Sequence, residues 1–132
     1  MRIARALVDE IFEHARQDLP NECCGIVSTN DGAAVAVYRA RNLHASPLRF
    51  EIEGQDQYRI HKAIEKAGHE FGVLYHSHVK SPAYPSQTDI THAERWPGVI
   101  WLIVSLADRD APDLKAFRIS GSDVEEVELT VA

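Results

Sequence analysis

The segment 71–89 constrains this chain more than any other, because it joins a buried strand, a loop and the start of a helix. Its first part, Phe71 to Tyr75, is an apolar run typical of a buried strand, and it leads directly to His76 and His78. Residues two apart on an extended chain point to the same face, so both imidazoles leave one side of the strand. A loop with two prolines then leads into a predicted helix whose first turn carries Asp89.

Two imidazoles at a strand end and a carboxylate on the next helix can meet at one point in space. Two nitrogen donors and one oxygen donor suit a zinc ion, and three protein ligands leave the fourth tetrahedral position open for water. The spacing of His76, His78 and Asp89 therefore predicts a catalytic zinc site. The structural alternative is a pair of hydrogen-bonded core histidines, which this spacing at a strand end disfavours.

Ser86 and Asp89 also have the spacing of a capping box, in which the carboxylate accepts the backbone N–H of the cap residue. Capping contributes about 1 kcal/mol, and zinc binding contributes roughly ten times more, so we expect a metal to take Asp89. The Ser86 hydroxyl could also donate to a developing oxyanion, and we expect that role to compete with capping for one proton. His92 lies one helical turn beyond Asp89, and we expect it beside the site or on the surface, not among the ligands.

A zinc hydrolase needs a group that accepts the proton of the attacking water, and Glu22 is the best candidate. It lies in a turn before a predicted strand, next to the apolar Cys23 and Cys24. The alternative is an exposed turn glutamate. The two cysteines are adjacent, which excludes a disulfide framework. Because successive strand positions point to opposite faces, at most one cysteine can face the metal, and we expect both to be structural.

Composition places the chain among globular proteins, with 132 residues, 45% hydrophobic and 26% charged. We expect a single domain over residues 1–132. The net charge of −6 and the lack of a basic stripe argue against nucleic-acid binding. Residues 1–19 include Asp9, Glu10 and Glu13 among apolar residues, which argues against a signal peptide. The longest apolar run is only about half of what a bilayer requires. We therefore expect a cytoplasmic protein without a membrane segment.

Periodicity and turn signals predict helices and strands in alternation. The sequence Asn30-Asp31-Gly32 predicts a hairpin turn, and the apolar run 99–106 predicts a central strand covered on both faces. This order implies an α/β protein with a mixed sheet and helices packed on it. The predicted helices run from Ile3 to before Pro20, over 54–68 and over 86–96. The first predicted strand ends at residue 28, and the others cover 33–39, 49–52, 71–78, 99–106, 113–119 and 124–131.

Together, five positions resemble the motif of the JAMM metallopeptidases, also called the MPN-plus or Mov34 family. The motif spans about half of the chain and consists of Glu22, His76-x-His78, Ser86 and Asp89. In that family the glutamate lies in an early strand that follows a helix. One position departs from the family pattern, because proline usually follows the second histidine and this chain has Val79. We therefore expect the conformation of this loop, more than its chemistry, to differ from that of the family.

The resemblance implies a three-layer α/β/α fold with a mixed sheet, like that of the cytidine deaminases. It implies zinc ligands at His76, His78 and Asp89, activation of water by Glu22 and stabilisation of the tetrahedral oxyanion by Ser86. The implied reaction is hydrolysis of the amide bond after the Gly-Gly tail of a ubiquitin-like protein. The short chain is similar to stand-alone prokaryotic members, whose substrates are ubiquitin-like sulfur carriers. Two alternatives stay open: a non-catalytic MPN-type scaffold that binds proteins, and a zinc amidase that acts on a small molecule.

Overall fold

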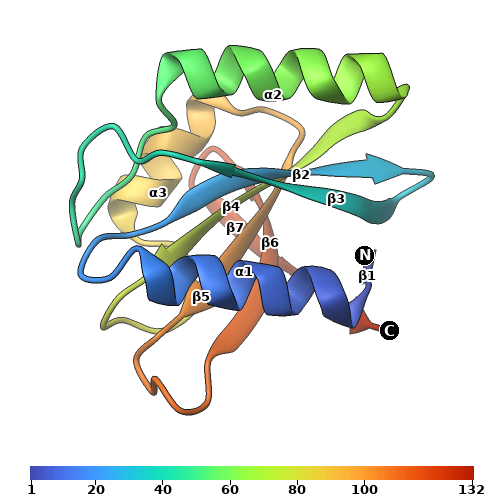
Figure 1. The fold of residues 1–132 in the computed structure, drawn as a ribbon. Coiled ribbons are helices and arrows are strands. Elements are labelled where there is room, and N and C mark those ends of the chain that lie inside the picture. Colours follow the sequence, from blue (N-terminus) through green and yellow to red (C-terminus); the bar gives the residue numbers. More distant parts are fainter.

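One eight-stranded mixed sheet forms the centre of the computed structural model, which describes all residues from 1 to 132 (Figure 1). The strand order is β7-β6-β5-β4-β2-β3-β1-β8. The central strands β4 and β5 run parallel, whereas β2 and β6, which flank them, run antiparallel to their neighbours. The strands are β1 (Arg2–Ile3), β2 (Cys24–Asn30), β3 (Ala33–Ala40), β4 (Glu70–His78), β5 (Ile100–Ser105), β6 (Asp113–Ser120), β7 (Asp123–Val127) and β8 (Thr130–Val131).

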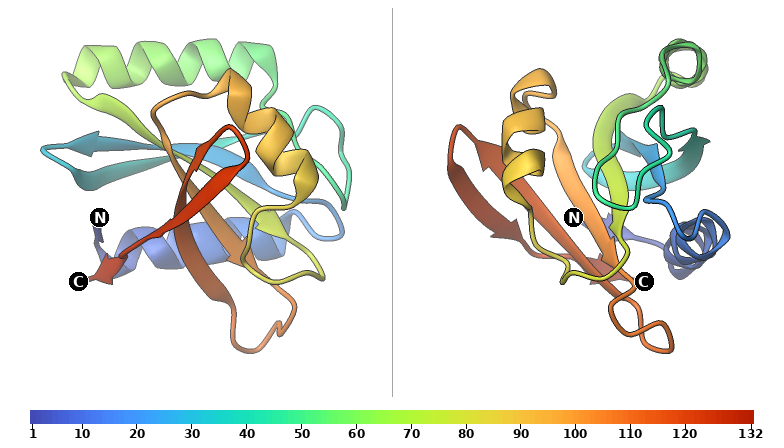
Figure 2. Two further views of the ribbon diagram at one scale, coloured as in Figure 1. Left: turned by 180° about the vertical axis from the view of Figure 1, so that it is seen from behind. Right: turned by 90° about the vertical axis from the view of Figure 1, so that its left-hand side faces the viewer.

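Helices cover both faces of the sheet, which confirms the predicted three layers. Helix α1 (Arg5–Gln17) covers one face, where its Ile11 belongs to the same buried cluster as Tyr75 and Leu102. Helices α2 (Gly54–Ala67) and α3 (Gln87–His92) cover the other face, where the second core cluster lies. Figures 1 and 2 show the β2–β3 hairpin passing between α1 and α2. None of the helices is long and apolar enough to cross a membrane.

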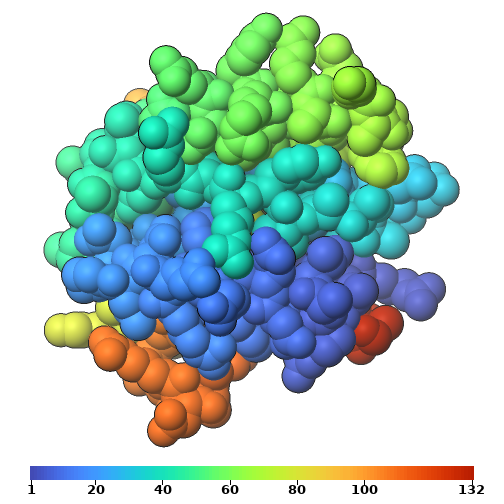
Figure 3. Space-filling model, in the orientation of Figure 1, coloured from blue at the N-terminus to red at the C-terminus, as the bar shows by residue number.

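The first residues of the chain form a strand, which corrects the prediction of a helix from Ile3. Ile3 lies in β1 and is buried, whereas α1 starts at Arg5. The two ends of the chain pair with each other: the Ala132 N–H donates to the Ile3 carbonyl oxygen at 3.0 Å. The space-filling view shows the last residues beside the first (Figure 3). Pairing with a remote segment therefore overrides the local helical periodicity.

Two other strand predictions are wrong for a similar reason. The segment 49–52 forms no strand and makes only an isolated bridge between Asn42 and Ile52. Phe50 and Ile52 are nevertheless buried, because their side chains enter the core from a loop. The segment 124–131 is divided: β7 continues the hairpin with β6, but β8 pairs with β1 at the opposite end of the strand order.

The predicted turns and the predicted helix over 54–68 agree with the structure. Asp31 and Gly32 both have positive φ, as the hairpin turn requires. Gly68 ends α2 in the left-handed conformation. The predicted helix over 86–96 is shorter than expected: Ser86 caps α3, which ends at His92, and one 3₁₀ turn, η1 (Ala93–Arg95), follows.

Candidate metal centre

The end of β4 and the first turn of α3 bring two imidazoles and one carboxylate together. His76 and His78 point to the face of the sheet that α3 covers, and both are buried. The Nε2 atom of His76 lies 3.1 Å from Oδ1 of Asp89, and Nε2 of His78 lies 3.0 Å from Oδ2. The ligand atoms of the three residues all lie within 4.8 Å of one another. This group could therefore hold a metal ion.

Asp89 also forms the capping box that was considered as an alternative role. The Ser86 N–H donates to Oδ2 of Asp89 at 2.9 Å, and the Asp89 N–H donates to the Ser86 hydroxyl oxygen at 3.1 Å. The capping bond orients the carboxylate and leaves Oδ1 facing His76. The Ser86 oxygen accepts in this cap, so its hydroxyl hydrogen stays free to donate. The expected competition for one proton is therefore wrong.

The hydrogen bonds of His78 favour a cation at this place. Its Nδ1 lies 2.9 Å from the Pro82 carbonyl oxygen, which can only accept, so Nδ1 carries hydrogen. In the neutral ring, Nε2 then presents a lone pair to the Asp89 carboxylate and to Nε2 of His76, which is 3.1 Å away. Acceptors that face acceptors in a buried site need a proton or a metal ion between them. The donor set of two nitrogens and one oxygen therefore fits a metal such as zinc.

The charges of the three residues agree with this arrangement. Burial opposes the charged form of His78, but Asp89, the Pro82 carbonyl and Glu22 outweigh it and raise the pKa of His78. Burial also opposes the carboxylate of Asp89, yet the two histidines and the Ser86 N–H hold its pKa well below the usual range. Burial lowers the pKa of His76. A metal ion that binds here competes with a proton for Nε2 of His78.

Glu22 is buried, and so it is not the exposed turn glutamate that was the alternative. Only 4% of its surface is exposed, and its Oε1 atom is buried without a hydrogen-bond partner. Burial raises the pKa of Glu22 to about 8, although the neighbouring His78 lowers it in part. Glu22 lines a cavity of about 370 Å³, which we call the cleft; its other lining residues are Pro47, Leu48, His78, Val79, Lys80, Ser81 and Ser86.

The loop after His78 is fixed from the side by β5. The Ser105 hydroxyl donates to the Ser81 carbonyl oxygen at 2.6 Å, and the Leu106 N–H donates to the His78 carbonyl oxygen at 2.9 Å. Val79, which stands where the family has proline, is buried at the cleft. The loop is therefore held by hydrogen bonds that the sequence does not reveal.

Phe50 is a site residue that the sequence patterns do not identify. Its ring stacks on His76, with ring centroids 4.3 Å apart and an interplanar angle of 19°. Trp101 contacts the same imidazole edge-on at 5.6 Å. These aromatic rings exclude water from one side of His76 and fix its orientation. The only signal in the sequence is the alternation of charged and apolar residues over 49–52, which predicted a strand.

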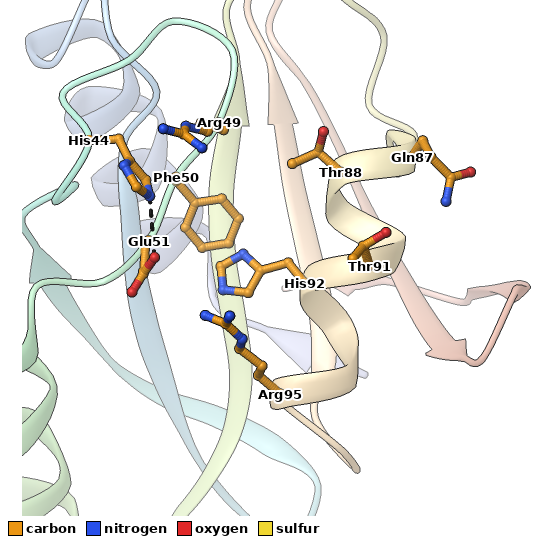
Figure 4. A pocket seen from close by; sticks show the side chains of 9 residues that line it. All are labelled: His44, Arg49, Phe50, Glu51, Gln87, Thr88, Thr91, His92 and Arg95. Carbon is orange, nitrogen blue, oxygen red and sulfur yellow. Dashed lines mark hydrogen bonds and ion pairs between the residues drawn. The ribbon is translucent and has the colours of Figure 1, made fainter.

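A second cavity of about 390 Å³ lies beside the first, between the loop that carries Phe50 and helix α3 (Figure 4). His92 lines it, packs 4.9 Å from Phe50 and accepts a hydrogen bond from the Trp96 indole at 3.2 Å. His92 is not a member of the three-residue group. Arg49 and Arg95 line the same cavity.

The adjacent cysteines are not among the potential ligands, although Cys24 is paired with His76 across β2 and β4. Cys23 packs in the core beneath α1, whereas Cys24 packs in the core beneath α2 and α3, so they point to opposite faces as predicted. Both are buried and free, and burial raises the pKa of the Cys23 thiol to about 12. Neither belongs to the three-residue group.

The chain is similar to a known protein family, to two named peptidases and to a solved structure. Residues 4–120 match the model of the family described as prokaryotic homologs of the JAB domain. A CysO-cysteine peptidase of Mycobacterium tuberculosis is 32% identical over 95% of this chain and 86% of that protein. A desampylase of Haloferax volcanii is 33% identical over 93% of this chain and 90% of that protein. The solution structure of a protein from Desulfitobacterium hafniense has a TM-score of 0.90 and 34% identity, and the match covers 100% of this chain and 93% of that chain.

Proposed function

The chain belongs to the family of prokaryotic homologs of the JAB domain, and we propose from this premise that it is a zinc-dependent peptidase of the JAMM type. Its substrate is a ubiquitin-like sulfur carrier whose C-terminal Gly-Gly is joined by an amide bond to a further group. The relatives named CysO-cysteine peptidase and desampylase support this substrate class. The single observation that carries the proposal is the buried carboxylate of Glu22, which shares the cleft with His78 and Ser86.

His76, His78 and Asp89 are the residues that would hold the zinc ion. Two nitrogens and one oxygen are a donor set that suits zinc, and the three ligand atoms all lie within 4.8 Å of one another. Bound zinc supplies a Lewis acid that polarises the scissile carbonyl and lowers the pKa of a water molecule. The fixed orientation of these side chains keeps the donor atoms in place before a metal arrives, because the capping box holds Asp89 and the Pro82 carbonyl holds His78.

Glu22 is the general base and then the general acid. Its Oε1 has no partner in the protein and is therefore free to take a proton from the attacking water. The hydroxyl group joins the carbonyl carbon, the C–N bond breaks, and Glu22 returns the proton to the leaving nitrogen. The products are a carboxylic acid on the carrier and an amine. Burial of Glu22 favours its protonated form, which suits the second step.

Ser86 stabilises the oxyanion that develops on the carbonyl oxygen. Its hydroxyl hydrogen is not used by the cap of α3, since the hydroxyl oxygen is the acceptor there. The hydroxyl lies at the cleft, where it can donate to a negative oxygen. Ser86 therefore holds α3, and with it Asp89, in place while its proton serves the reaction.

The test is a metal analysis combined with a hydrolysis assay. The substrate is a ubiquitin-fold sulfur carrier whose Gly-Gly tail is extended by one alanine, and mass spectrometry follows loss of the alanine. Glu22→Gln should keep the metal and lose turnover by about 10²–10⁴-fold. Glu65→Gln, an exposed position on α2, is the matched control. A protein that binds the carrier without metal or turnover would be a scaffold, and one that cleaves only small amides would be a zinc amidase.

A further inference from the structure

We propose that Lys80 binds the free carboxylate of the residue that leaves the carrier tail. The enzyme then removes a single C-terminal amino acid in preference to a protein linked through a lysine side chain. This inference rests on the proposed function and deepens it, because it names the class of leaving group.

The position of Glu22 determines where the leaving group must lie. Glu22 delivers a proton to the leaving nitrogen, so that nitrogen has to enter the cleft that the carboxylate lines. The cleft measures about 370 Å³, which is enough for one amino-acid residue and far too small for a folded protein. In an amino acid, a single carbon atom separates the amine from the carboxylate. The carboxylate must therefore lie in the same cleft and needs a cationic partner there.

Lys80 is the only lysine or arginine that lines the cleft. Its ammonium group forms none of the ion pairs in the structure, whereas Lys62, for example, pairs with Glu65. The backbone on both sides of it is held, because Val79 is buried and the Ser81 carbonyl accepts the hydrogen bond from Ser105. The loop therefore keeps an unpaired cation at the rim of the cleft.

One part of the cleft wall is apolar. Pro47, Leu48 and Val79 line it, and Leu48 is 82% exposed although it is a large hydrophobic residue. An apolar wall with one cation at its rim matches an uncharged amino acid whose free carboxylate points outward. A lysine-linked protein would bring its aliphatic side chain but no carboxylate to Lys80.

The arginines of the second cavity are less suited to bind this carboxylate. Arg49 and Arg95 line the second cavity, which Glu22 does not reach (Figure 4). The buried ring of Phe50 lines that cavity and stacks on His76, so it covers the side of the imidazole that faces the cavity.

A third cavity, of about 780 Å³, touches the other side of Glu22 and also contains arginines. There, however, carboxylates already neutralise them. Arg41 binds Asp56 at 3.0 Å, and Arg39 binds Glu10 at 3.1 Å. Among these candidates, Lys80 alone combines a free charge with a place in the cleft.

The test compares two chemically ligated substrates, in which the carrier ends in Gly-Gly-Ala with either a free carboxylate or a carboxamide. The zinc-loaded wild-type enzyme should prefer the free acid in kcat/KM by roughly five- to tenfold, as one partly exposed charge contact allows. Lys80→Gln should remove this preference by slowing only the free acid, and Lys80→Arg should retain it. Arg95→Gln is the matched control and should leave the preference unchanged.

Binding gives a second readout that does not depend on turnover. Calorimetry with the Glu22→Gln protein should show the same preference for the free acid, and adding Lys80→Gln should abolish it. Hydrolysis of both substrates at equal rates overturns the role of Lys80 and leaves the proposed function intact. If the wild-type enzyme binds the free acid preferentially but hydrolyses neither substrate, the role of Lys80 is supported and the proposed function is overturned. A preference that disappears in Arg95→Gln instead places the carboxylate in the second cavity and also overturns the inference.

Discussion

Gly25 lies so close to the ring of Tyr75 that a β-carbon at position 25 would collide with the ring and with the Tyr38 carbonyl oxygen. The two residues are paired across β2 and β4, and Tyr75 directly precedes His76 in β4. The Tyr75 hydroxyl in turn lies 2.7 Å from Nδ1 of His14 in α1. Glycine at position 25 therefore lets the aromatic ring lie across β2 and join the sheet to α1.

Replacing Gly25 with alanine should destabilise the fold by about 1–3 kcal/mol, because the added methyl group overpacks a buried contact. Gly54→Ala is the matched control, since a β-carbon there meets open space. Chemical unfolding followed by circular dichroism measures both. Equal stability of the two variants would show that Tyr75 can move aside without cost.

Removing one proposed ligand should release the metal. We expect about one zinc per chain in protein purified without chelator, and almost none in His78→Ala, because two remaining ligands bind weakly. His61→Ala, at an exposed position of α2, is the control and should keep its metal. Elemental analysis reports the content directly. Metal that stays bound in His78→Ala must be held by other residues.

The cysteines should be dispensable for the metal, despite the affinity of thiolates for zinc. Cys23→Ser and Cys24→Ser each place a hydroxyl in an apolar core, so each should lower stability by about 1–3 kcal/mol while the zinc content stays at the wild-type value. Elemental analysis and thermal unfolding of the same samples separate the two effects. A drop in zinc in either folded variant would contradict the structural role.

Glu22 should make the metal-free protein less stable as the pH rises. Burial raises the pKa of Glu22 in the folded protein to about 8, whereas an unfolded glutamate has a pKa of about 4.3. Between these values the folded state holds a proton that the unfolded chain has released, so the contribution of Glu22 to stability is lost with increasing pH. Glutamine does not ionise and escapes this loss.

Between pH 5 and pH 8, the free energy of unfolding of metal-free Glu22→Gln protein should therefore rise relative to that of metal-free wild type. The change should be on the order of a few kcal/mol. Thermal unfolding of both proteins at the two pH values measures this change. A constant difference would mean that Glu22 is solvated. The residue that we propose for proton transfer thus weakens the fold that carries it.

Some features of this chain follow from local chemistry and are readable in its sequence. The alternation along β4 places His76 and His78 on one face, and the capping signal at Ser86 places Asp89 in the first turn of α3. The hairpin at Asp31 and Gly32 and the end of α2 at Gly68 depend on left-handed backbone positions that few residues favour. These features involve neighbours in the chain, which is why patterns and spacing predict them.

Other features depend on partners that are remote in the sequence. Ile3 lies in a strand because the C-terminal segment pairs with it, and Phe50 enters the core from a loop because His76 offers a ring to stack on. The burial that raises the pKa of Glu22 and the hydrogen bond that fixes the loop beside Lys80 likewise come from the packed fold. The sequence alone thus determined which side chains could form the site. Only tertiary packing decided their solvation, their orientation and the cleft they share, because those properties depend on contacts between segments that the chain does not place side by side.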